Sequence, residues 1–118
     1  MPDALPWRNE ILGIRDRGLA LRIDKREVVA AWSAILRVGA VLSFADLRCD
    51  RLAPVLVLGI VVDGEERLLL VAKADPMWDA LISTLPGRLP GMRSTQSLDA
   101  ELAAVGKASL YDRAGRLQ

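Results

Sequence analysis

Residues 55 to 73 have the sequence VLVLGIVVDGEERLLLVAK, which is two apolar runs on either side of Asp63-Gly64-Glu65-Glu66. An Asp-Gly pair suits a type I′ turn, because both central residues of that turn need a positive φ, and the turn joins antiparallel strands. The sequence therefore predicts a β-hairpin formed by Val55–Val62 and Arg67–Lys73. Both runs are apolar at successive positions instead of alternating. We therefore expect each face of the sheet to be covered, by a helix, a second sheet layer or a partner chain.

A second hairpin is expected near the N-terminus. The segments Glu10–Arg15 and Leu19–Ile23 flank Asp16-Arg17-Gly18, and Gly18 can take the positive φ that a short hairpin loop needs. Leu19, Leu21 and Ile23 alternate with period two, so they should face one side of the sheet.

The stretch 27–38 allows two interpretations. Val28, Trp32, Ile35 and Leu36 fit one face of a helix. We favour a third strand over Glu27–Trp32 followed by a short turn, because β-branched residues occur there and Gly39 would end a helix early. Leu36 to Cys49 then predicts a fourth strand with a bulge near Gly39.

The C-terminal part predicts helices. Asp75-Pro76 is typical of a helix start, with Asp75 as the capping residue and Pro76 at the first helical position. The residues expected to form its buried stripe are Trp78, Leu81, Ile82 and Leu85, and Pro86-Gly87 should end it. Ser97 is expected to cap a shorter helix through Val105 that stops at Gly106, and Lys107 to Gln118 has too few apolar residues to predict.

Composition excludes several classes of function. Sixteen Lys and Arg balance fifteen Asp and Glu, so no large field of one sign is available to attract nucleic acid. The chain has no histidine, which removes Ser-His-Asp and Cys-His catalysis and histidine-ligated metal sites. Cys49 is the only cysteine, so no disulfide can form within the chain, and no apolar run is long enough to span a membrane. We expect a cytoplasmic protein that is not an enzyme and has neither cofactor nor metal.

Several antiparallel strands followed by a capped helix make the chain similar to small bacterial proteins of the pleckstrin-homology-like (PH-like) type. The similar segments are Gly18-Leu19-Ala20-Leu21-Arg22, Val28 to Trp32 with Ser33-Ala34-Ile35, Val38 to Leu47, the Asp63-Gly64 hairpin and Asp75-Pro76-Met77-Trp78-Asp79-Ala80-Leu81. The resemblance covers about residues 10 to 87. It implies a mainly β fold, a partly open antiparallel barrel of about six or seven strands capped by an amphipathic helix. It also implies a non-enzymatic binding role.

This interpretation divides the chain into three parts. Residues 1–9 form an N-terminal arm, residues 10–92 the PH-like barrel with its capping helix, and residues 93–118 a short helix and tail. The part from Arg93 onward departs from the PH-like pattern, and an added helix that binds a partner or a second copy would fit there.

Two groups of residues are candidate binding sites. Arg15, Arg17, Arg22 and Lys25 lie around the first hairpin, where relatives of this fold hold phosphoinositide headgroups. Asp16 and Asp24 dilute that positive charge, so we expect a solvated hairpin and no phosphoinositide. Trp7, in the Pro-flanked arm, either folds back over the barrel or contacts a partner.

The sequence thus predicts a protein-binding module whose partner is unknown. One version is an immunity or antitoxin-like protein that masks a toxin. A second hypothesis is a structural homo-oligomer in which another copy covers the apolar strands Val55–Val62 and Leu68–Val71.

Overall fold

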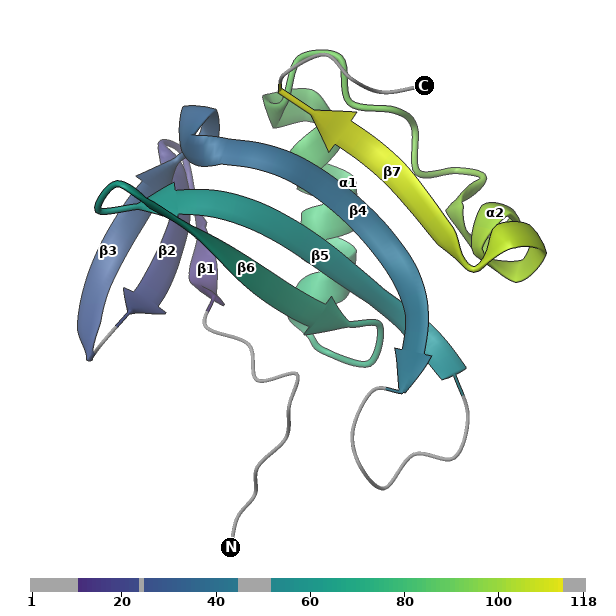
Figure 1. Cartoon of the computed structure of the whole chain (residues 1–118). Coiled ribbons are helices and arrows are strands. Elements are labelled where there is room, and N and C mark those ends of the chain that lie inside the picture. The colour runs from purple at the N-terminus through teal and green to yellow at the C-terminus, as the bar shows by residue number, and fades with distance from the viewer. Residues whose placement is uncertain (1–10, 24, 45–51, 114–118) are drawn as a thin grey trace, which may run out of the picture.

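The computed structural model describes residues 11–23, 25–44 and 52–113 of the 118-residue chain. These residues form seven strands and two α-helices, which confirms a mainly β fold with added helices (Figure 1). A three-stranded antiparallel sheet has the order β1–β2–β3, and a four-stranded antiparallel sheet has the order β6–β5–β4–β7. The two sheets do not close into a barrel. The strands are β1 (Ile11–Arg15), β2 (Gly18–Ile23), β3 (Arg26–Ala31), β4 (Ile35–Phe44), β5 (Leu52–Val62), β6 (Glu65–Ala72) and β7 (Lys107–Asp112).

The central hairpin forms as its sequence predicts. β5 and β6 pair without a register shift from Val62 opposite Glu65 to Val55 opposite Ala72. Asp63 has a φ of 54° and Gly64 a φ of 82°, the two positive values that a type I′ turn requires. The local sequence therefore predicts most of β5 and β6 correctly.

The first hairpin also forms, and Gly18 has the expected positive φ, 159°, which residues with a side chain rarely adopt. A second reason for glycine was not expected. A Cβ atom at Gly18 would lie only 1.8 Å from the carbonyl oxygen of Ala30 on β3, so the close approach of β3 also excludes a side chain.

The ambiguous stretch 27–38 is a strand followed by a turn, as we favoured. β3 ends at Ala31, a single 3₁₀ turn (η1) covers Trp32–Ala34, and β4 begins at Ile35. The register between β4 and β7 shifts between Val38 and Gly39, but the extra residue there is Leu110 on β7. β4 itself is irregular against β5 between Ile35 and Arg37, so the bulge expected in the fourth strand near Gly39 lies elsewhere. Residues 45–49 of the predicted fourth strand lie outside the described residues.

The main helix, α1 (Met77–Arg88), begins where predicted and ends later. The carboxylate of Asp75 accepts the backbone N–H of Met77 at 2.8 Å, so Asp75 satisfies a free amide at the helix start. The predicted end at Pro86-Gly87 is wrong, because both residues lie inside the helix. The helix ends at Arg88, and the next residue, Leu89, is extended (φ −113°, ψ 106°) because a following proline, here Pro90, disfavours the helical conformation.

The shorter helix and the last strand complete the four-stranded sheet. α2 (Leu98–Val105) follows Ser97 and ends at Gly106, whose φ of 87° is left-handed, as expected. The Ser97 side chain makes no capping hydrogen bond, so that part of the prediction is wrong. The tail also contains a strand that we did not predict, because β7 pairs with β4. The bulge turns both Leu110 and Tyr111 towards the core, which breaks the alternation that would identify a strand in the sequence.

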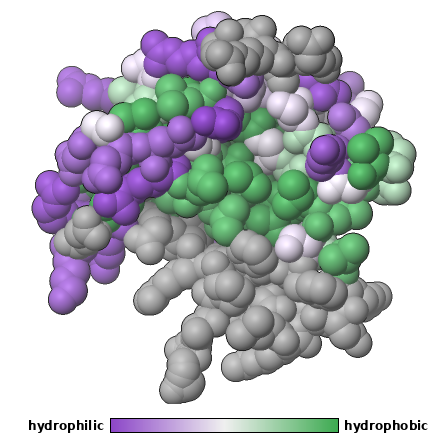
Figure 2. Space-filling view, viewed as in Figure 1, coloured by the Kyte–Doolittle hydropathy of each residue, from purple (hydrophilic) through white to green (hydrophobic). Residues whose placement is uncertain are grey.

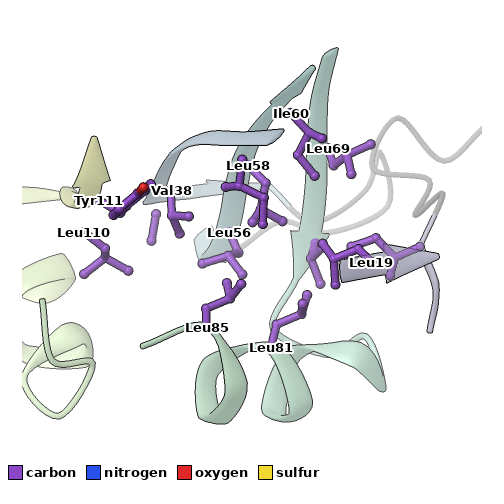
Figure 3. Packing of buried hydrophobic residues seen from close by; sticks show 14 of the residues in the cluster. Leu19, Val38, Leu56, Leu58, Ile60, Leu69, Leu81, Leu85, Leu110 and Tyr111 are labelled. Atoms are coloured by element: carbon purple, nitrogen blue, oxygen red, sulfur yellow. The ribbon is translucent and has the colours of Figure 1, made fainter. Parts of the chain in front are cut away.

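The hydrophobic core lies between the four-stranded sheet, the three-stranded sheet and α1. Leu81 and Leu85 of α1 point towards Leu56 and Leu58 of β5, and Leu19 of β2 lies beside them (Figure 3). Trp78 is also buried in this cluster, as its place on the predicted stripe indicates. With 12 and 8 residues, α1 and α2 are too short for the roughly 20 apolar residues of a membrane-crossing helix.

Candidate functional site

One face of the four-stranded sheet packs on the core, and the opposite face, here called the outer face, points away from it. Leu56, Leu58 and Ile60 of β5 are fully buried on the core side, so by alternation the residues between them point outward. Strand pairing extends this assignment across the sheet. The outer face consists of Arg37, Gly39, Val41 and Ser43 of β4, Val55, Val57, Gly59 and Val61 of β5, Glu66, Leu68, Leu70 and Ala72 of β6, and Lys107, Ser109 and Asp112 of β7.

The outer face is apolar over its middle. Figure 2, which has the same viewpoint as Figure 1, shows hydrophobic side chains gathered there. Val57, Val61 and Leu70 are half-buried, and the Leu68 side chain on β6 is 64% exposed. A contiguous apolar patch is more informative than isolated exposed leucines, because such patches mark interaction surfaces.

An ion pair lies at one border of this patch. The Arg37 guanidinium lies 3.0 Å from the Glu66 carboxylate, and the two side chains extend towards each other over Gly59. A Cβ atom at Gly59 would come within 2.7 Å of a Glu66 carboxylate oxygen, so the glycine makes room for the pair. Both charges are partly exposed, so the pair shapes the surface and contributes little to stability.

A hollow lies at the other border, next to α2. Its volume is about 470 Å³, and it is open to solvent. Gly39, Val41 and Val57 form its floor, and Val105 of α2, which is 66% exposed, forms part of its wall. A volume of this size can receive several atoms of an apolar side chain or small molecule.

Two of the three charged residues that line the hollow, Arg93 and Glu101, form an ion pair, and the third, Lys107, is exposed. Arg93 donates to both carboxylate oxygens of Glu101, at 2.7 and 3.3 Å, and to the backbone carbonyl of Ser109 at 2.7 Å. Arg93 therefore uses most of its hydrogen-bond donors on Glu101 and Ser109, within the wall of the hollow. The hollow therefore presents mainly apolar surface, and a partner would gain from burying apolar groups in it.

A second hollow of about 370 Å³ lies beside Trp32, where the first hairpin meets the end of α1. The Trp32 indole N–H donates to the backbone carbonyl of Asp16 at 2.9 Å, and the Arg88 guanidinium lies 5.6 Å from the ring centroid. These contacts attach the first hairpin to the helix. Trp32 is half-buried and has this structural role.

The structure separates the four basic residues of the predicted ligand site. Arg15 and Arg17 lie at the β1–β2 turn, whereas Arg22 and Lys25 lie at the β2–β3 turn. These turns are at opposite ends of β2, about 17 Å apart at roughly 3.3 Å per residue. All four side chains are exposed, and Arg22 lies 3.9 Å from Glu27. The four residues therefore do not form one pocket for a phosphorylated headgroup.

The remaining predicted candidates are placed only in part. Trp7 lies outside the described residues. Among residues 11–23, 25–44 and 52–113, no three Asp, Glu, Cys or His side chains gather as metal ligands would.

The hollow beside α2 was not predicted from the sequence. The sequence did show that both faces of the β5–β6 hairpin are apolar. The position of Arg93, Val105 and Lys107 beside that face depends on β7 pairing with β4, which no local pattern indicates. Comparison with protein-family models, curated proteins and solved structures finds no match to this chain.

Proposed function

We propose that the chain is a non-enzymatic protein-binding module that binds its partner on the outer face, with the hollow beside α2 as the anchoring pocket. The observation that supports this best is an apolar floor, formed by Gly39, Val41 and Val57, open to solvent on a folded sheet. The described part of the chain covers the opposite face with α1 and the three-stranded sheet (Figure 1). A partner chain is one of the covers that the hairpin sequence suggested for the second face of this sheet.

The partner that fits is a protein segment with one or two large aliphatic side chains at its centre. Aliphatic groups would bury the floor, and the Arg93–Glu101 pair would lie at the rim, where exposed charges contribute little affinity. Binding energy would come mainly from apolar area removed from water.

Two further parts of the proposal concern fold type and location. Two antiparallel sheets with α1 packed between them support a PH-like assignment, and α2 and β7 would be additions to that plan. A chain whose single cysteine allows no internal disulfide suits a reducing compartment, which supports a cytoplasmic location.

Site-specific photocrosslinking tests the proposed surface. A photoreactive amino acid would replace Val105, at the wall of the hollow, and in a matched variant Val29, which is similarly exposed on β3. In the cells that produce the protein, we expect position 105 to give a single adduct with another protein, and position 29 to give none.

The charged substitution Val57→Lys in the floor should abolish that adduct, because it places an ammonium group in the apolar site, whereas Val29→Lys should leave it unchanged. Equal crosslinking at both positions, no adduct at 105, or an adduct that survives Val57→Lys would each refute the proposal. An adduct with twice the mass of the chain would mean that another copy is the occupant, and would refute a different protein as partner.

A further inference from the structure

The outermost strand of the four-stranded sheet, β6, has a regular and open edge. Val62 and Glu65 flank a two-residue turn, so they form a hydrogen-bonded pair, and every second residue of β6 pairs with β5 in the same way. The residues between them, Glu66, Leu68 and Leu70, direct their N–H and C=O groups away from β5. Within the described residues, no backbone group bonds to these outward groups.

The opposite edge of the same sheet is occupied. The carbonyl of Leu110 on β7 accepts the backbone N–H of Arg93 at 2.9 Å, and the carbonyl of Ser109 accepts the Arg93 side chain at 2.7 Å. Proteins commonly protect exposed edges with charged side chains, proline or a bulge. The charged residues of β6, which has the sequence EERLLLVA, are confined to the end next to the turn, and Leu68–Ala72 has none of these features.

We propose that β6 pairs in antiparallel fashion with β6 of a second copy, about a two-fold axis that passes beside Leu68. In this register Leu68 lies opposite Leu68 of the partner subunit, and Glu66 lies opposite Leu70 of the partner subunit. The outward groups of Glu66, Leu68 and Leu70 then form three reciprocal pairs with two hydrogen bonds each. The two four-stranded sheets become one continuous sheet.

Charge and hydrogen bonding select this register over its neighbours. If the two-fold axis passed beside Arg67 instead of Leu68, Arg67 would lie directly opposite Arg67 of the partner subunit, and like charges in that position repel. If the axis passed beside Leu69, Glu66 would pair with Ala72 of the partner subunit. That pair needs the Ala72 carbonyl, which already accepts the Asp75 N–H at 2.9 Å. In the proposed register, none of the three charged residues of β6, Glu65, Glu66 and Arg67, faces its own copy.

The surroundings of β6 also favour a second copy over a charged partner. Among the described residues, β6 itself carries Glu65, Glu66 and Arg67, and Glu66 pairs with Arg37. Next to the two ends of β6, Asp63 pairs with Arg26 and Lys73 pairs with Asp99, so the charges on and beside the strand balance. A surface with balanced charge can meet its own copy without net repulsion. The two exposed Leu68 side chains would shield each other from water. The apolar outer faces of the two copies would become continuous across the two-fold axis. Most of the residues that line the hollow lie on β4, α2 and β7, and only Val57 of β5 borders β6, so both copies could still bind a partner there.

The oligomeric state tests the proposal. Light scattering should give twice the chain mass of 12.9 kDa at micromolar to submillimolar concentration. Leu68→Pro should give a monomer, because it removes an outward N–H that β5 does not use, so the strand itself can remain. Val29→Pro is the matched control, since Val29 holds the equivalent outward position on β3, and it should remain a dimer. A monomeric parent protein, or a dimer that survives Leu68→Pro, would overturn the proposal.

Cysteine crosslinking tests the register without relying on a proline variant that folds. In a Cys49→Ser background, Leu68→Cys should oxidise to a covalent dimer, because a directly opposed pair has a Cα–Cα distance of about 5.5 Å, within the disulfide range. Glu66→Cys and Leu70→Cys should each give little dimer alone, but should crosslink when the two variants are mixed. Equal crosslinking at all three positions would overturn the register. Leu70 pairs with Val57, so the distinguishing variants are those of Leu68, which pairs with Gly59 and does not line the hollow. Failure at Leu68 and failure of the partner-binding proposal are therefore distinguishable.

Discussion

Truncation of neighbouring leucines on β6 tests which face of the sheet is the core. Leu69 is 5% exposed and belongs to the hydrophobic core, whereas Leu68 is 64% exposed on the outer face. Burying a whole leucine side chain stabilises a fold by about 1.5–3 kcal/mol, and the cavity left by truncation raises the cost to about 2–5 kcal/mol. Leu69→Ala should therefore lower the free energy of unfolding by about 3 kcal/mol.

Leu68→Ala should cost much less. Only about a third of that side chain is buried, and no enclosed cavity results, so the expected loss is about 1 kcal/mol or less. Urea unfolding followed by circular dichroism would measure both values from the midpoint and the slope. The protein should be dilute enough to be monomeric, because association adds a concentration-dependent term to stability.

The ratio of the two losses is the decisive quantity. A shift of one residue in the pairing of β6 would exchange the faces of every side chain on the strand. Equal losses, or a larger loss for Leu68→Ala, would therefore refute the register of β5 and β6 and the position of the outer face.

Two further predictions concern the core and the first hairpin. Trp78→Ala should lower the free energy of unfolding by about 3–5 kcal/mol, because Trp78 anchors α1 in the core, whereas Arg17→Ala at an exposed turn should change it by no more than about 0.5 kcal/mol. A thermal unfolding midpoint that hardly moves for Trp78→Ala would show that the helix is not anchored in this way. Gly18→Ala should cost about 3 kcal/mol or more, since its Cβ would overlap the Ala30 carbonyl, and an amide exchange pattern unchanged in β2 and β3 would contradict the close approach.

Local sequence was sufficient where a short segment determines its own conformation. The Asp63-Gly64 turn needs two positive φ values, and this pair adopts them, so the hairpin is determined by residues next to each other in the chain. The apolar stripe of α1 and the left-handed Gly106 after α2 were predictable for the same reason. The end of α1 was not, because Pro90 stopped the helix through its effect on Leu89, and Pro86 did not.

The candidate binding surface depended on contacts between distant segments. The sequence showed that both faces of β5 and β6 are apolar, but it could not show which face α1 covers. That choice follows from the packing of Leu81 and Leu85 on Leu56 and Leu58. The hollow formed only when β7 paired with β4 and brought α2 alongside.

By itself, then, the sequence determined the turns, the helix starts and the apolar positions, because each depends on backbone preferences within a few residues. The tertiary structure alone decided which apolar face remains open, how far apart the basic residues lie and which sheet edge is free. Those properties depend on pairing between residues such as Val41 and Lys107, far apart in the chain, which local preferences do not specify.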